Sequence, residues 1–138
     1  MALRIELKPS ERLIINGALI RNGDRRSVFL VETPCRFLRE SEIIREADAD
    51  TISKKLCVTL QVIYLDESAA EAENLLVMQS IEILKTIPGS APYLVAIHDA
   101  LAAKQYHLAI KTGRKLIAYE DEMGGKNWDR GADLVAVG

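Results

Sequence analysis

The chain has 138 residues, of which 49% are hydrophobic and 28% are charged, and its formal net charge is −2. This composition is typical of a globular protein with one ordinary domain or two small ones. No apolar run approaches the roughly 20 residues of a membrane-spanning helix, and the first residues lack the apolar core of a signal peptide. We therefore expect a cytoplasmic protein with no membrane segment.

Residues 1–46 predict a small antiparallel β module. Short apolar runs bounded by Pro, Gly or Asn are typical of strands, and here they are Leu3–Leu7, Leu13–Ile15, Val28–Val31 and Cys35–Leu38. In the first run apolar residues alternate with Arg4 and Glu6, so one face can be buried while the other stays charged. A module of this size is marginal alone, so we expect it to lean on the rest of the chain or on a second copy in a homodimer.

Two Asn-Gly pairs predict the turns of this module. Asn16-Gly17 and Asn22-Gly23 each supply residues that tolerate the positive φ angles of tight hairpins. The second pair opens a basic turn that ends in Arg25 and Arg26.

The charges are distributed unevenly. Residues 1–46 carry nine Lys or Arg residues against seven Asp or Glu residues, whereas the remainder carries nine against thirteen. All the basic residues of the first part except Lys8 are arginines. Arginine suits phosphate binding and base stacking, although most charges on a small β module simply face the solvent.

Residues 47–123 predict a helical domain of about four helices. Residues 52–65 fit both a helical face and a β alternation, and we favour the helix because of its N-cap residues and the helices beyond. A long helix is expected from about residue 67 to 87, and Pro88-Gly89-Ser90 should stop it. A third helix should begin near Pro92, and a fourth should run from about residue 103 to 122. Gly124-Gly125 should end the fourth helix and leave residues 124–138 as a loosely held tail.

This order of a β module followed by helices resembles the FlbT family of post-transcriptional regulators of flagellin expression. The resemblance covers nearly the whole chain and rests on Leu7–Arg12, Ile15–Ala18, Asn22–Arg26 and Leu38–Ile43. It implies a protein that binds the untranslated leader of flagellin messenger RNA and alters its translation or lifetime. It also implies that a small protein, FlaF, acts in the same circuit.

The β module also resembles the carbon storage regulator fold, an interwoven dimer that grips an RNA loop. The strand spacing and the stretch Arg39-Glu40-Ser41-Glu42-Ile43 carry this likeness. It implies that Arg39 is the principal RNA residue and that Lys8 contacts a phosphate. The chain departs from that fold in having Leu7-Lys8 where a basic pair is expected, and in its added helices.

Physical reasoning extends the candidate RNA site to three further arginines. A guanidinium at a strand end, as on Arg39, can reach a base edge or stack on an unpaired base, and Arg36 is expected on the same face of that strand. Arg25 and Arg26 follow a turn whose backbone N–H groups could share a phosphate with them. The alternative is that these arginines form ordinary surface ion pairs, Arg25 with Asp24 or Glu32 and Arg39 with Glu42.

Nothing in the sequence indicates an enzyme, a metal site or another cofactor. Cys35 and Cys57 lack metal-binding spacing and are expected to be buried reduced thiols. His98 and His107 lack the i, i+4 spacing of a helical metal pair. Two functions stay open: an RNA-binding regulator, with no DNA or membrane partner, and a protein-binding adaptor that uses helical residues such as Val77 and Ile81 to bind FlaF or flagellin. Exposure of these apolar residues would favour the adaptor, and a contiguous arginine surface would favour RNA.

Overall fold

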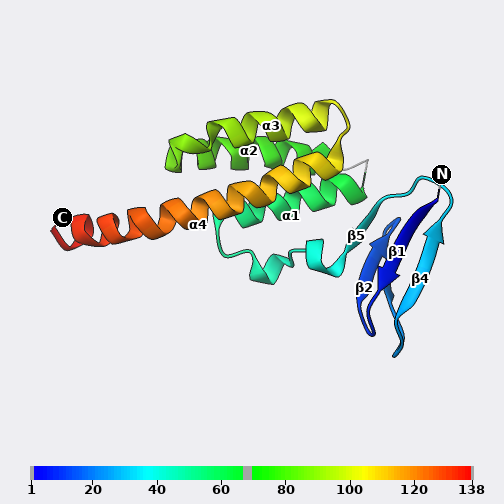
Figure 1. Cartoon of the computed structure of the whole chain (residues 1–138). Helices are drawn as coiled ribbons and strands as arrows, with labels where there is room; N and C mark the ends of the chain where they lie inside the picture. The colour runs from blue at the N-terminus through cyan, green and yellow to red at the C-terminus, as the bar shows by residue number, and fades with distance from the viewer. Residues whose placement is uncertain (1, 67–69, 138) are drawn as a thin grey trace. The chain divides into compact units, whose positions relative to one another are not determined.

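A computed structural model describes residues 2–66 and 70–137, with side chains for residues 2–66 and 70–123. The architecture of these residues is α+β, as predicted: five short antiparallel strands precede four helices that pack together (Figure 1). The chain divides into two compact units. The β unit comprises Met1–Ile43 and Tyr64–Ser68, and the helical unit comprises Ile44–Ile63 and Ala69–Gly138.

The β unit contains two small sheets. Its strands are β1 (Leu3–Leu7), β2 (Arg12–Ile15), β3 (Ala18–Arg21), β4 (Ser27–Val31) and β5 (Phe37–Arg39). Strand β1 pairs with β4, and β2 lies between β3 and β5. The buried residues Ile5 and Leu7 of β1 pack with Leu13 of β2, so this cluster forms the core shared by the two sheets. The alternation of apolar residues in β1 thus predicted the burial of Ile5 and Leu7 correctly, whereas Leu3 at the start of the strand is exposed.

Only one of the two Asn-Gly pairs forms the predicted hairpin. Asn16 and Gly17 have φ angles of 48° and 83°, and they join β2 to β3, a strand that the sequence reasoning did not identify. The prediction for Asn22-Gly23 is wrong, because neither residue has a positive φ and β4 pairs with β1 instead of β3. The side chain of Asn22 organises this turn by another means, described below.

The helical unit contains α1 (Ile52–Leu65, whose last two residues belong to the β unit), α2 (Ala70–Thr86), α3 (Ala91–Ala102) and α4 (Tyr106–Val137). Residues 52–65 fitted both a helix and a strand, and the favoured helix is confirmed. Leu56, Leu60 and Ile63 recur at helical spacing and are all buried. The stop at Pro88–Ser90 is confirmed as a short 3₁₀ turn between α2 and α3.

Helices α1 and α4 approach each other closely at Gly113. A Cβ atom at this position would lie 2.8 Å from the Cys57 sulfur and 3.1 Å from a methyl group of Leu60, so only glycine fits without a shift. Burial raises the pKa of the Cys57 thiol to about 12, which identifies it as a buried packing residue, as predicted. Cys35 is a free thiol as expected, but the expectation that it is buried is wrong, because it is only half-buried.

The predicted end of the fourth helix is wrong. Helix α4 continues to Val137 and passes through Gly124-Gly125. A glycine in a helix costs about 1 kcal/mol relative to alanine, but it keeps the backbone N–H that proline lacks, so it weakens a helix without breaking it. The side chains beyond residue 123, including those of the predicted tail, lie outside the described part of the chain.

Candidate nucleic-acid interface

Three arginines from separate parts of the β unit meet at Glu6 on strand β1. Ile5 and Leu7 point into the core, so Arg4 and Glu6 point away from it. Arg26, just before β4, approaches the Glu6 carboxylate to 2.6 Å, and Arg4 lies 4.0 Å from its other oxygen. The antiparallel register places Arg26 there, because Leu7 lies opposite Ser27 and the preceding residue emerges beside the end of β1.

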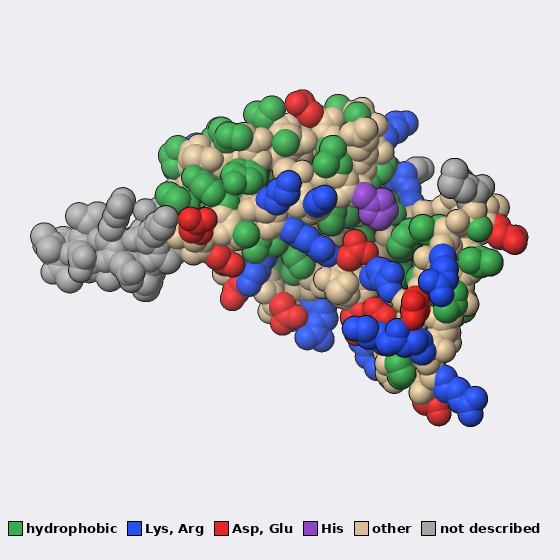
Figure 2. Space-filling view, viewed as in Figure 1, with side chains coloured by type: hydrophobic (Ala, Val, Ile, Leu, Met, Phe, Trp, Pro, Cys, Tyr) green, Lys and Arg blue, Asp and Glu red, His purple; other side chains and the backbone are tan. Residues whose placement is uncertain are grey.

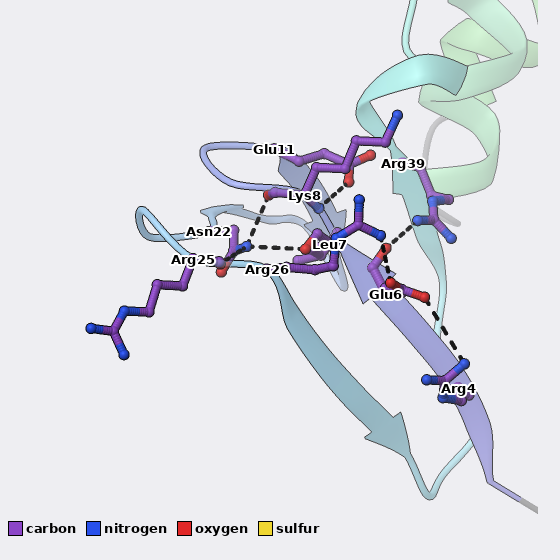
Figure 3. Close-up of polar contacts among 9 residues, drawn as sticks. All are labelled: Arg4, Glu6, Leu7, Lys8, Glu11, Asn22, Arg25, Arg26 and Arg39. Carbon is purple, nitrogen blue, oxygen red and sulfur yellow. Dashed lines mark hydrogen bonds and ion pairs between the residues drawn. The ribbon is translucent and has the colours of Figure 1, made fainter.

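Arg39 reaches the same place from strand β5. Its guanidinium donates a hydrogen bond to the backbone carbonyl of Glu6 (Figure 3). Its backbone N–H donates to the Glu42 carboxylate at 3.1 Å. The expected pairing with Glu42 therefore involves the backbone of Arg39, while the guanidinium turns toward β1. Among the described residues this contact uses one nitrogen of a guanidinium that carries five N–H donors in all.

Asn22 fixes the turn that presents Arg26. Its buried side-chain amide donates to the carbonyls of Leu7, Lys8 and Arg25, at 3.2, 2.8 and 2.8 Å. Its carbonyl oxygen accepts from the Gly23 N–H and the Ser27 hydroxyl, each at 2.9 Å. Two of these contacts tie Asn22 to the end of β1, and the other three hold residues 22–27 together; the three donated contacts share the two hydrogens of the amide. We call this arrangement the Asn22 clamp.

Lys8 neighbours the three arginines along the chain, and Arg25 lies apart from them. Lys8 follows β1 directly, and no carboxylate among the described residues pairs with its exposed ammonium. Arg25 extends away from the other labelled side chains (Figure 3). Neither Asp24 nor Glu32 forms an ion pair with it among the described residues, so the expected surface pair is not seen.

Arg36 lies at a different place. Its guanidinium donates to the Tyr64 carbonyl at 2.7 Å and sits 5.9 Å from the centre of the Tyr64 ring. It thus covers a carbonyl at the end of helix α1, where a positive charge is favourable. The expectation that Arg36 shares a face with Arg39 is wrong, because the two residues are three positions apart and strand side chains alternate with a period of two.

The cluster of Arg4, Lys8, Arg26 and Arg39, which we call the β1 cluster, has an excess of positive charge. The hydrogen bond from Arg26 is the main cause that lowers the pKa of Glu6, and the charges of Arg4 and Arg39 add to it. Three arginines thus act on the Glu6 carboxylate, and Lys8 follows directly after β1. Two further carboxylates lie at this site, because Glu11 accepts from the Lys8 N–H and Glu42 accepts from the Arg39 N–H. Figure 2 also shows several Lys and Arg side chains on the surface of the β unit. Such a site can bind phosphate oxygens and stack against unpaired bases.

Sequence reasoning missed the roles of Arg4, Glu6 and Asn22. The alternation in β1 was a usable signal for the first two, because it puts both on one face. Nothing local indicated that Arg26 and Arg39 would converge on Glu6, since that depends on β1 pairing with β4 and on the position of β5.

The described residues contain no group of three or more His, Cys, Asp or Glu side chains placed to hold a metal ion. His98, one of the two histidines considered from the sequence, instead contacts the Ser80 hydroxyl at 2.9 Å. Within the described part of the chain, no helix is both long and apolar enough to span a membrane.

Known proteins resemble this chain over most of its length. Residues 3–123 match the family model described as flagellar protein FlbT. A flagellum biosynthesis repressor protein FlbT of Caulobacter vibrioides is 33% identical over 131 residues, which cover 91% of each chain. Probable repressors of the same name are 32% identical in Caulobacter sp. strain K31, over 91% of this chain and 98% of the relative, and in Bradyrhizobium diazoefficiens, over 91% and 87%.

These relatives are named as repressors of flagellum biosynthesis, that is, as regulators and not as enzymes. No solved structure matches the chain. With the family model matching almost the whole of the β and helical units, the chain belongs to the FlbT family of flagellar proteins.

Proposed function

We propose that this chain represses flagellum biosynthesis by binding the 5′ untranslated leader of flagellin messenger RNA in the cytoplasm and altering its translation or lifetime. The names of the relatives support the repression, because they are repressors of flagellum biosynthesis that align with nine-tenths of this chain. The β1 cluster is the observation that carries the RNA step, because three arginines meet at Glu6 and Lys8 directly follows the same strand.

The four cations have different tasks in this proposal. Lys8, Arg4 and Arg26 are exposed and bind phosphates. Arg39 is half-buried. Glu42 holds its backbone and the Glu6 carbonyl holds its guanidinium, which is thus oriented to read an unpaired base in an RNA loop. The resemblance of the β module to the carbon storage regulator fold supports this assignment of Arg39 and Lys8.

The proposal gives Arg25 and Arg36 lesser roles. Arg25 can meet a phosphate only outside the β1 cluster, and Arg36 is engaged with Tyr64. The expected partners are the flagellin leader, a FlaF-like protein and a second copy of the chain in a homodimer. No DNA, membrane or cofactor enters the mechanism.

Two neighbouring arginines provide a matched test of the β1 cluster. Arg25→Ala and Arg26→Ala each remove one exposed positive charge, but only Arg26 belongs to the cluster. We expect Arg26→Ala to reduce the salt dependence of leader binding by about one phosphate contact, a change of roughly 0.7 in the slope of log K against log salt. Arg25→Ala should stay close to wild type. The measurement is a fluorescence-anisotropy titration at several salt concentrations.

Equal losses in the two variants would contradict the cluster as the binding site and indicate general attraction to a basic surface. If Arg25→Ala reduces the salt dependence of leader binding more than Arg26→Ala does, the RNA site lies at the tip of the turn that carries Arg25. Circular dichroism of both variants provides the control for folding.

A protein-binding adaptor is the second candidate function. The exposure of Val77 and Ile81 was expected to favour it, and both residues are exposed. Val77 and Ile81 on α2 are each 49% accessible. Ile81 also lines a groove between α2 and α3 with the apolar residues Leu84 and Val95. In this alternative the groove holds a segment of FlaF or of flagellin, and the effects on RNA are indirect.

A further inference from the structure

Helix α2 buries only one narrow side. Leu76, Ser80 and Ile83 are its buried residues, and they follow each other at helical spacing. Met78 lies on the opposite side, because two residues along a helix correspond to a rotation of about 200° from Leu76. Its exposed fraction is 68%, the highest among the large hydrophobic residues of the described chain.

Met78 is the centre of an exposed apolar ridge. Leu75 and Ile81 lie three residues before and after it and are 45% and 49% exposed. Glu71 and Lys85 lie seven residues before and after it, and both are exposed on the same side of the helix. Seen in space-filling form, the surface over α2 and α3 carries many hydrophobic side chains (Figure 2). Glu82, four residues after Met78, is also exposed on this side, and Asn74 stands four residues before it. The ridge therefore has an apolar middle and an acidic start, and its other end carries both Glu82 and Lys85.

We propose that this ridge binds the same ridge of a second copy of the chain, with the two α2 helices antiparallel about a two-fold axis at Met78. Residues equally distant from Met78 then face each other. Leu75 of one copy lies opposite Ile81 of the other, and Glu71 of one copy lies opposite Lys85 of the other. A two-fold interface must be complementary to itself in this way.

The charges on the ridge favour a second copy over a foreign partner. An antiparallel pair sets two Glu71–Lys85 ion pairs at the ends of the interface and excludes the parallel arrangement, which would put like charges together. The hollows beside the ridge supply room for the opposing side chains. One, of about 470 Å³, is lined by Leu75 and Val62, and the other, of about 360 Å³, by Ile81 and Val95.

This inference deepens the homodimer that the proposed function includes, by naming the surface that forms it. One helix pair buries less than the roughly 800 Å² per partner of a standard interface, so the dimer should be weak and dependent on concentration. Its test needs no RNA, so the dimer and the RNA site can fail separately.

The test is analytical ultracentrifugation of the full chain at a series of concentrations. Wild type should show a monomer–dimer equilibrium. Met78→Glu places two carboxylates at the axis and should raise the dimer dissociation constant at least about a hundredfold. Leu30→Glu is the matched control on β4, because Leu30 is 64% exposed and lies outside the ridge. It should leave the equilibrium unchanged.

Charge exchange then distinguishes a second copy from any other occupant. Glu71→Lys and Lys85→Glu should each weaken the dimer by about tenfold, because each sets like charges opposite each other twice. The double variant Glu71→Lys, Lys85→Glu should restore it, since the exchanged charges again face each other.

Three results would overturn the proposal. Wild type could stay monomeric throughout, which would leave the ridge to a FlaF-like partner. Leu30→Glu could abolish the dimer while Met78→Glu keeps it, which would place the dimer on the β unit. The double charge variant could stay as weak as the single variants, which would exclude the antiparallel register.

Discussion

Asn22→Ala is expected to lower the free energy of unfolding of the β unit by about 3 kcal/mol. The substitution removes the whole Asn22 clamp, with its three donated and two accepted hydrogen bonds. A typical hydrogen bond contributes about 1 kcal/mol net, and a buried carbonyl left without its donor costs about as much again. Water can reach part of this turn and solvate some of the freed groups, which keeps the expected loss below the sum of five bonds.

The free energy of unfolding is measured by urea denaturation, and hydrogen exchange of the backbone amides in β1 and β4 reports on the β unit. Asn16→Gly is the matched control, because Asn16 also stands in a turn, and within the described chain its side chain accepts one hydrogen bond, from the Arg36 N–H at 3.1 Å. Glycine also tolerates its φ of 48°. An Asn22→Ala protein as stable as the Asn16→Gly protein would show that the clamp does not hold the turn.

Arg39→Ala is expected to lose the preference for the flagellin leader over a scrambled RNA by roughly tenfold to a hundredfold. The reason is that a bidentate guanidinium contact to a base contributes about 1 to 3 kcal/mol of discrimination. Binding to both RNAs should persist at low salt, because Lys8, Arg4 and Arg26 still attract phosphates. Affinities for both RNAs are measured side by side, since a loss of affinity alone would not identify a base contact.

Arg39→Lys separates the charge of this residue from its shape. Lysine keeps the positive charge but lacks the planar fork, so this variant should keep the salt slope of wild type and still lose the preference for the leader. If Arg39→Lys instead retains the full preference, Arg39 acts through its charge and the base contact is elsewhere. Thermal unfolding of both variants is the control, because Arg39 also bonds the Glu6 carbonyl.

Local patterns in the sequence predicted most elements of the fold. The alternation in β1 identified Ile5 and Leu7 as core residues, and the positive φ angles that Asn16-Gly17 can adopt identified the first hairpin. Residues 52–65 fit both the spacing of a helical face and the alternation of a strand, so their sequence alone does not distinguish the two structures. The burial of Leu56 and Leu60 in the helical unit is what selects the helix. Gly124-Gly125 misled the prediction because helix propensity is a weak effect that neighbouring turns can outweigh.

The candidate site was harder to predict, because it depends on strand pairing. Arg39 and Lys8 came from the family resemblance, and Arg26 was singled out together with Arg25 although only one of them lies in the β1 cluster. Choosing between these neighbours requires the register of β1 against β4, which no local pattern gives. The sequence identified Asn22 as a turn residue because of the φ angles its backbone can adopt. In the structure it is the side chain of Asn22 that holds the turn, through hydrogen bonds to the carbonyls of Leu7 and Lys8.

The most direct test of the RNA proposal is the affinity of the wild-type protein for the flagellin leader and for a scrambled RNA of equal length at physiological salt. The account predicts tighter binding of the leader, with a salt slope that corresponds to several phosphate contacts. Absent binding, or equally weak binding of both RNAs, would contradict a direct reader. Regulation would then have to pass through the groove between α2 and α3 and its protein partner.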